Sequence, residues 1–115
     1  MTQNAPLPTI YCALDSIDIG RVLELSVALS NAGCGIKLGL EFFNAHGPQG
    51  VHQVLSNGVT PSVFLDLKYK DIPNTVAGAV RAAASLDVAY LNIHADGGAE
   101  MMRQAKAACA PKTRL

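Results

Sequence analysis

Residues 64–75 read FLDLKYKDIPNT, an apolar run that gives way to Asp66, Lys68, Lys70 and Asp71. The apolar start is typical of a strand in a buried parallel sheet. Because alternate side chains of a strand point to the same side, Asp66 and Lys68 are expected to share one face, about 6–7 Å apart along the backbone. Burying an unpaired charge is costly, so this strand is predicted to end at a polar pocket and not inside a closed core.

The same arrangement, a short apolar run followed by a longer helical pattern, occurs four times along the chain. Strands separated by helices imply a parallel sheet with right-handed crossovers. The predicted strands are 9–14, 34–40, 62–67 and 87–93. The predicted helices are one that is capped by Asp15 or Ser16 and ends near Asn31, a short piece at 41–45 followed by a helix from Pro48, one from Pro73, and one over 97–110.

Two parallel architectures fit this order, an open doubly wound sheet and part of a TIM (βα)8 barrel. The first strand is not followed by GxGxxG or GxxxxGK[ST], so nothing supports a nucleotide-binding open sheet. Polar or charged residues stand at the carboxyl end of every predicted strand, namely Asp15, Lys37, Asp66 with Lys68, and His94. In a barrel these ends converge on one mouth, where catalytic groups lie. We therefore predict an α/β fold, a parallel (βα)4 half of a TIM (βα)8 barrel, with residues 1–115 as a single partial domain.

The composition limits the possible partners. The 115 residues correspond to about one modest domain. Half of them are hydrophobic and 16% are charged, which is enough to fill a core and argues against disorder. Lys plus Arg equals Asp plus Glu at 9 each, so no overall field favours nucleic acid or an anionic membrane. An anionic ligand must therefore be bound by a local cluster of charges.

Cysteine usage and the amino terminus bear on the cellular compartment. The three cysteines, Cys12, Cys34 and Cys109, show no CxxC spacing, which disfavours a zinc or dithiol redox site and is typical of reduced thiols. The first ten residues lack the basic and apolar regions of a secretory signal. No uncharged apolar run approaches the roughly 18–20 residues of a membrane helix. We predict a cytoplasmic protein that binds neither nucleic acid nor a membrane.

Each polar residue also has a simpler interpretation. Asp15 alone is best explained as a helix N-cap, and Lys37 as a lysine that extends its ammonium to water. Lys70 is expected to be a solvated loop charge, and His94 is as easily a neutral, hydrogen-bonded histidine as a functional one. Asp71 lies where the chain turns into the next helix, so it can face a neighbouring subunit instead of its own pocket. Acids and amines alternating in one cavity would nonetheless suit electrostatic and proton-transfer catalysis without a metal.

At these residues the sequence resembles a known enzyme family. DLKYKDIPNT (66–75) is similar to the DxKxxDI…PxT signature of the orotidine 5'-monophosphate decarboxylases. ALD (13–15), IKLGLEFF (36–43) and NIHADGGAEMM (92–102) resemble the bacterial branch of that family in the same order. DxKxxD alone is shared with related 3-keto sugar-acid phosphate decarboxylases, whereas IPNT and the IKLG block favour the nucleotide enzyme.

The resemblance implies conversion of orotidine 5'-monophosphate to uridine 5'-monophosphate in pyrimidine biosynthesis, and it assigns roles to four residues near the strand ends. Asp66 would lie near the substrate carboxylate, and Lys68 would stabilise and then protonate the carbanion at pyrimidine C6. Lys37 would hold the ribose and bridge to Asp66. Asp15 would bind a ribose hydroxyl.

The resemblance also implies a homodimer, in which Asp71 and Thr75 reach into the active site of the partner subunit, and no metal or organic cofactor. A (βα)8 barrel needs about 250 residues, so four units make half of one. The glutamine and arginine that bind the phosphate in the family have no counterpart here. The chain is therefore interpreted as the catalytic half of a decarboxylase, and the alternative is a non-catalytic half-barrel that self-associates.

Overall fold

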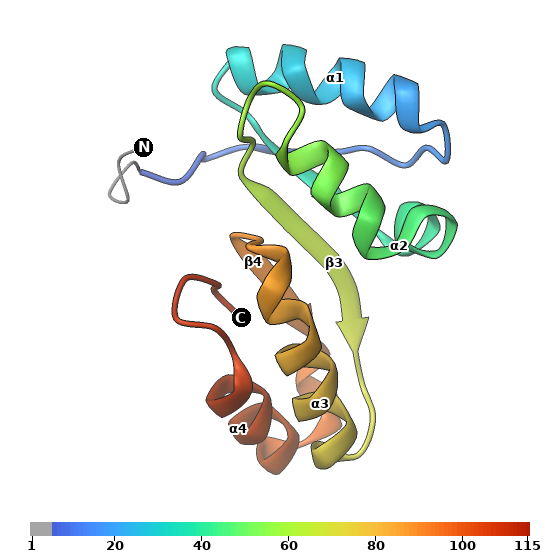
Figure 1. The fold of residues 1–115 in the computed structure, drawn as a ribbon. Helices are drawn as coiled ribbons and strands as arrows, with labels where there is room; N and C mark the ends of the chain where they lie inside the picture. The colour runs from blue at the N-terminus through green and yellow to red at the C-terminus, as the bar shows by residue number, and fades with distance from the viewer. Residues whose placement is uncertain (1–5) are drawn as a thin grey trace. The chain divides into compact units, whose positions relative to one another are not determined.

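The computed structural model describes residues 6–115, and by its internal contacts the chain forms two compact units, Met1–Phe64 and Leu65–Leu115. The elements are β1 (Tyr11–Ala13), α1 (Ile19–Asn31), β2 (Gly35–Leu38), α2 (Leu40–Leu55), β3 (Val63–Tyr69), α3 (Pro73–Ala83), η1 (Ala84–Leu86), β4 (Tyr90–Ile93), η2 (Ala95–Gly97) and α4 (Ala99–Ala108). The strand order is β1-β2-β3-β4. The predicted alternation of strands and helices in a parallel sheet is confirmed (Figure 1).

In the first unit, β1 and β2 pair in parallel, with Tyr11 opposite Gly35 and Ala13 opposite Lys37. β1 is shorter than the predicted strand 9–14. The core of this unit is apolar and rich in β-branched side chains, which pack well on a sheet that helices cover. Its fully buried members include Val22 from α1, Ile36 from β2 and Phe42 from α2.

The start of α1 differs from the prediction. Neither Asp15 nor Ser16 caps the helix; Asp18 does, and its Oδ1 accepts a hydrogen bond from the backbone N–H of Arg21 at 3.1 Å. An N-cap side chain must reach the second or third N–H of its helix, and a helix that begins at Ile19 places that N–H at Arg21. The interpretation of Asp15 as a helix cap is therefore wrong.

Helix α2 bends at one point, where two helical pieces were predicted. Gly47 has φ 62° and ψ −160°, and Pro48 follows it. A positive φ is easy for glycine, and proline lacks the N–H that would continue the hydrogen-bond ladder. The predicted interruption near Pro48 is therefore confirmed.

In the second unit, β3 continues two residues past its predicted end at Leu67, and β4 begins at Tyr90. The backbone N–H of His94 donates to the carbonyl of Tyr69 at 3.0 Å, which joins the segments at the carboxyl ends of the two strands. Helices α3 and α4 lie side by side (Figure 1). The backbone of Arg114 pairs in parallel with Tyr90, so the carboxyl-terminal segment adds to the sheet.

Candidate active site

Asp66 and Lys68, from the stretch 64–75, contact each other in the second unit. Lys68 Nζ lies 2.7 Å from Asp66 Oδ1, so the prediction that these side chains share one face is confirmed. The Asp66 side chain is 8% exposed and that of Lys68 is 48% exposed. A buried carboxylate bonded to a partly solvated ammonium is an arrangement that fixes the acid and leaves the amine accessible to a ligand.

Lys68 has an unusual backbone. Its φ is 53°, one of two positive values among the described residues other than glycine. The left-handed region costs a residue with a Cβ about 1–2 kcal/mol, so other contacts must hold it. The backbone N–H of Lys68 donates to Asn92 Oδ1 at 2.8 Å. This bond joins the backbone of β3 to a side chain of β4.

Asn92 is the site residue that reasoning from the sequence missed. Its Nδ2 donates to Asp66 Oδ1 at 2.7 Å, while its Oδ1 accepts from Lys68. The available signal was its position in β4, two residues before His94, where a polar side chain interrupts an apolar strand. Only the pairing of β3 with β4 brings this amide to the Asp–Lys pair.

In the first unit, Asp15 and Lys37 lie near the carboxyl ends of adjacent strands. The backbone N–H of Leu14 donates to the carbonyl of Lys37 at 3.0 Å, which fixes the two segments side by side. Asp15 is exposed and Lys37 is partly buried. That Asp15 and Lys37 share one pocket with Asp66 and Lys68 stays a prediction.

Asp71 and Thr75 are both exposed, in the turn before α3 and in its first helical turn. Asp71 Oδ1 accepts from the backbone N–H of Ile72 at 2.6 Å. Ile72 itself is 65% exposed, and it is one of five large hydrophobic side chains that are exposed among the described residues. The structure thus places these residues at the surface, and their role across a dimer interface stays a prediction.

Lys70 is exposed, as predicted, but it also forms an ion pair, since its Nζ lies 2.9 Å from Asp96 Oδ2. The hydrogen bond from Lys70, together with its charge, lowers the pKa of the Asp96 carboxyl below its ordinary value. Burial raises the pKa of the Tyr69 phenol, because removal from water disfavours the anion. His94 is exposed and lies just beyond β4.

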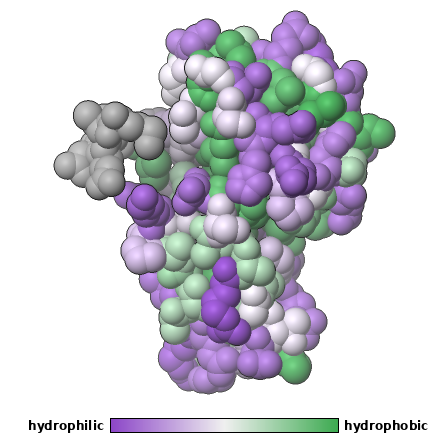
Figure 2. Space-filling model, viewed as in Figure 1, coloured by the Kyte–Doolittle hydropathy of each residue, from purple (hydrophilic) through white to green (hydrophobic). Residues whose placement is uncertain are grey.

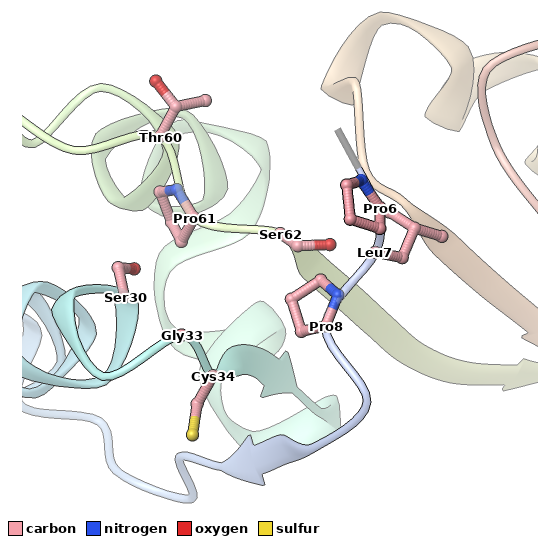
Figure 3. Close-up of a pocket in the computed structure, with 9 residues that line it drawn as sticks. All are labelled: Pro6, Leu7, Pro8, Ser30, Gly33, Cys34, Thr60, Pro61 and Ser62. Carbon is pink, nitrogen blue, oxygen red and sulfur yellow. The ribbon is translucent and has the colours of Figure 1, made fainter. Parts of the chain in front are cut away.

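Two hollows elsewhere lack such pairs of opposite charges. In the first unit, a cavity of about 360 Å³ lies at the amino ends of the strands (Figure 3). It is lined by Pro6, Leu7, Pro8, Ser30, Gly33, Cys34, Thr60, Pro61 and Ser62, none of them charged. In the second unit, small and weakly hydrophobic residues lie over α3 and α4 (Figure 2), and a hollow there has Arg81 as its one charged lining residue.

Residues 6–115 contain no group of three His, Cys, Asp or Glu side chains placed to hold a metal ion. Over the same residues, every helix is too short or too polar to cross a bilayer.

Comparison with known sequences identifies relatives along almost the whole chain. Residues 8–115 match the family model described as orotidine 5'-phosphate decarboxylase / HUMPS family. A Rhodospirillum rubrum protein named orotidine 5'-phosphate decarboxylase is 49% identical over 94% of this chain and 42% of its own length. One of the same name from Ehrlichia chaffeensis is 51% identical over 84% of this chain and 41% of its own length. The chain thus spans somewhat less than half the length of these relatives.

Solved structures of proteins with this name have a similar fold. Orotidine 5'-phosphate decarboxylase from Lactobacillus acidophilus has a TM-score of 0.78 at 30% identity, covering 95% of this chain and 48% of that one. The Pyrococcus horikoshii protein of that name, at 22% identity, also has a TM-score of 0.78 and shows likeness of fold alone. Coverage of about half of each chain agrees with the predicted half of a TIM (βα)8 barrel. This chain is a member of the orotidine 5'-phosphate decarboxylase / HUMPS family.

Proposed function

We propose that this chain carries the Asp66–Lys68 part of an orotidine 5'-monophosphate decarboxylase active site, as the amino-terminal half of the barrel. The observation that carries the proposal is the 2.7 Å contact between a buried carboxylate and a half-exposed ammonium. Such a pair fixes the ammonium beside a buried carboxylate, which is what catalysis by a preorganised charge requires.

The reaction that we assign to this pair is the loss of carbon dioxide from pyrimidine C6. The bond from C6 to the carboxylate breaks, carbon dioxide leaves, and the electron pair stays on C6. The Lys68 ammonium stabilises this carbanion and donates a proton to it, which gives uridine 5'-monophosphate and a neutral amine that solvent reprotonates. Asp66 holds the ammonium and lies near the substrate carboxylate.

The remaining predicted residues extend this proposal. Lys37 and Asp15 bind the ribose, and their adjacent positions in the first unit suit two neighbouring hydroxyl groups. Asp71 and Thr75 act on the partner subunit of a homodimer, for which the exposure of Ile72 beside Asp71 is the supporting feature. We place the enzyme in the cytoplasm and propose no metal or organic cofactor.

The choice of substrate rests on the relatives. The relatives described above are named orotidine 5'-phosphate decarboxylase, although the family as a whole is broader. This favours the nucleotide over a 3-keto sugar-acid phosphate. It also favours a catalytic half over a half-barrel that only self-associates.

The test is turnover of orotidine 5'-monophosphate by a chimera in which this chain replaces the matching 42% of the Rhodospirillum rubrum protein. We expect the chimera to release carbon dioxide and form uridine 5'-monophosphate. Lys68→Ala should lower kcat by about 10²–10⁴-fold, which is the usual contribution of a positioned proton donor.

Lys70→Ala is the matched control, because Lys70 is equally exposed and equally ion-paired but points to Asp96. Its kcat should be unchanged. Turnover retained by Lys68→Ala would overturn the proton-donor assignment. A chimera that is folded by circular dichroism and still inactive would overturn the proposed function as a whole.

A further inference from the structure

The Asn92 side chain makes two contacts of opposite polarity, one as a donor and one as an acceptor. It donates to Asp66 Oδ1 at 2.7 Å and accepts the backbone N–H of Lys68 at 2.8 Å. The carboxylate can only accept and the backbone N–H can only donate, so the orientation of the amide is fixed. A flipped amide would oppose two donors at one end and two acceptors at the other.

These two contacts act on both members of the Asp66–Lys68 pair. The bond to Asp66 adds a donor to a carboxylate that is buried, where a lost hydrogen bond is expensive. The bond to Lys68 supports a backbone with φ 53°, and this conformation sets the direction in which the Lys68 side chain leaves β3. One side chain on β4 therefore sets the acid and the amine of β3 together.

We propose that Asn92 is a positioning residue that holds Asp66 and Lys68 in the geometry the reaction needs. The claim that Asn92 affects catalysis rests on the proposed function. The claim that Asn92 fixes Asp66 and Lys68 rests only on the geometry of the second unit. Aspartate at this position has the same shape but would place a second carboxylate against Asp66. Leucine has a similar volume and can make neither bond.

The first experiment measures geometry on the 115-residue chain by NMR. The Lys68 amide should exchange slowly with solvent, because its proton is bonded to Asn92 Oδ1. In Asn92→Leu it should exchange at least about 10-fold faster, the change that corresponds to roughly 1.4 kcal/mol of lost protection. Asn57→Leu is the control, since the Asn57 amide also bonds across elements, to the Leu23 carbonyl at 3.2 Å, but in the first unit.

The second experiment measures kcat and KM in the active chimera. Asn92→Asp and Asn92→Leu should lower kcat and kcat/KM equally, by at least about 10-fold, because small errors in position slow the chemical step. KM should be unchanged, and Asn57→Leu should leave both constants unchanged. Asn92→Asp retains the shape of the side chain, so it reports on the catalytic geometry if the leucine variant fails to fold.

The outcomes separate this proposal from the proposed function. An unchanged Lys68 amide in folded Asn92→Leu would overturn the positioning role, whether or not the chimera is active. An altered amide together with unchanged kcat would overturn its catalytic consequence. If the chimera itself is inactive, the proposed function fails, while the amide experiment still decides whether Asn92 fixes Lys68.

Discussion

The carboxylate of Asp66 is buried and the ammonium of Lys68 is half exposed, although the two groups are 2.7 Å apart. The two ends of this ion pair therefore differ in how far water can replace a lost partner. Solvent can hydrate Lys68 when Asp66 is changed, but it has little access to Asp66 when Lys68 is changed. The pair of Lys70 with Asp96, 2.9 Å apart, has both members exposed and provides a comparison within the same unit.

Replacing each lysine should reveal this difference in stability. We expect Lys68→Ala to lower the free energy of unfolding by about 1–2 kcal/mol, because it removes a charged partner from a buried carboxylate. Lys70→Ala should lower it by clearly less, since exposed ion pairs contribute little. Urea unfolding of both variants measures the two values. Equal losses would show that burial of Asp66 does not matter.

The Asp96 carboxyl should titrate below its ordinary pKa of 3.8. Because the pKa is lowered in the folded state, the pair with Lys70 stabilises the protein above about pH 4 and is lost as the pH falls through the lowered pKa. Carbon-detected NMR titration of the side chain measures this directly. In Lys70→Ala the pKa of Asp96 should rise toward 3.8. About 1 M salt should also raise this pKa, because salt screens the charge of Lys70. If the pKa of Asp96 is the same in Lys70→Ala, Lys70 is not the cause of the lowered pKa.

A side chain at Gly97 would force the Met101 side chain to move. A Cβ at this position would lie 2.2 Å from Met101 Sδ, and Met101 is fully buried. We expect Gly97→Ala to lower the free energy of unfolding by about 1–3 kcal/mol through overpacking. Gly78→Ala is the matched control: it lies inside α3, where the nearest atom is 3.8 Å away. It should raise stability by about 0.5–1 kcal/mol, so a denaturation midpoint that moves the same way in both variants would contradict this reasoning.

Ser30 and Ser26, both on α1, should respond differently to replacement by alanine. Ser30 Oγ is buried without a hydrogen-bond partner among residues 6–115, whereas Ser26 Oγ donates to the carbonyl of Leu23 at 2.9 Å. We expect Ser30→Ala to raise the free energy of unfolding by about 1 kcal/mol, since it removes an unpaired polar group and favours the helix. Ser26→Ala should lower it or leave it unchanged, because a made hydrogen bond is lost. Thermal unfolding of the two variants gives the comparison, and a loss of stability in Ser30→Ala would refute the prediction.

Much of the fold follows from local patterns in the sequence. Apolar runs bounded by helical patterns fixed the order of strands and helices, because each pattern reflects which faces of one element are buried. Gly47 and Pro48 marked the interruption of α2 for reasons of backbone geometry alone. The closeness of Asp66 and Lys68 followed from the two-residue period of a strand. The cap of α1 was predicted wrongly at Asp15 or Ser16, because only the position of the first helical turn selects Asp18.

Only the tertiary structure decided which side chains from other segments contact these residues. The sequence by itself determined which side chains of β3 share a face of the strand, because this alternation depends only on the backbone dihedral angles within the strand. It did not indicate that Asn92, 24 residues after Lys68, supplies the amide that bonds both Asp66 and Lys68, or that Asp96 pairs with Lys70. Those contacts depend on the register between β3 and β4, and a register is set by how whole elements pack and not by any one segment.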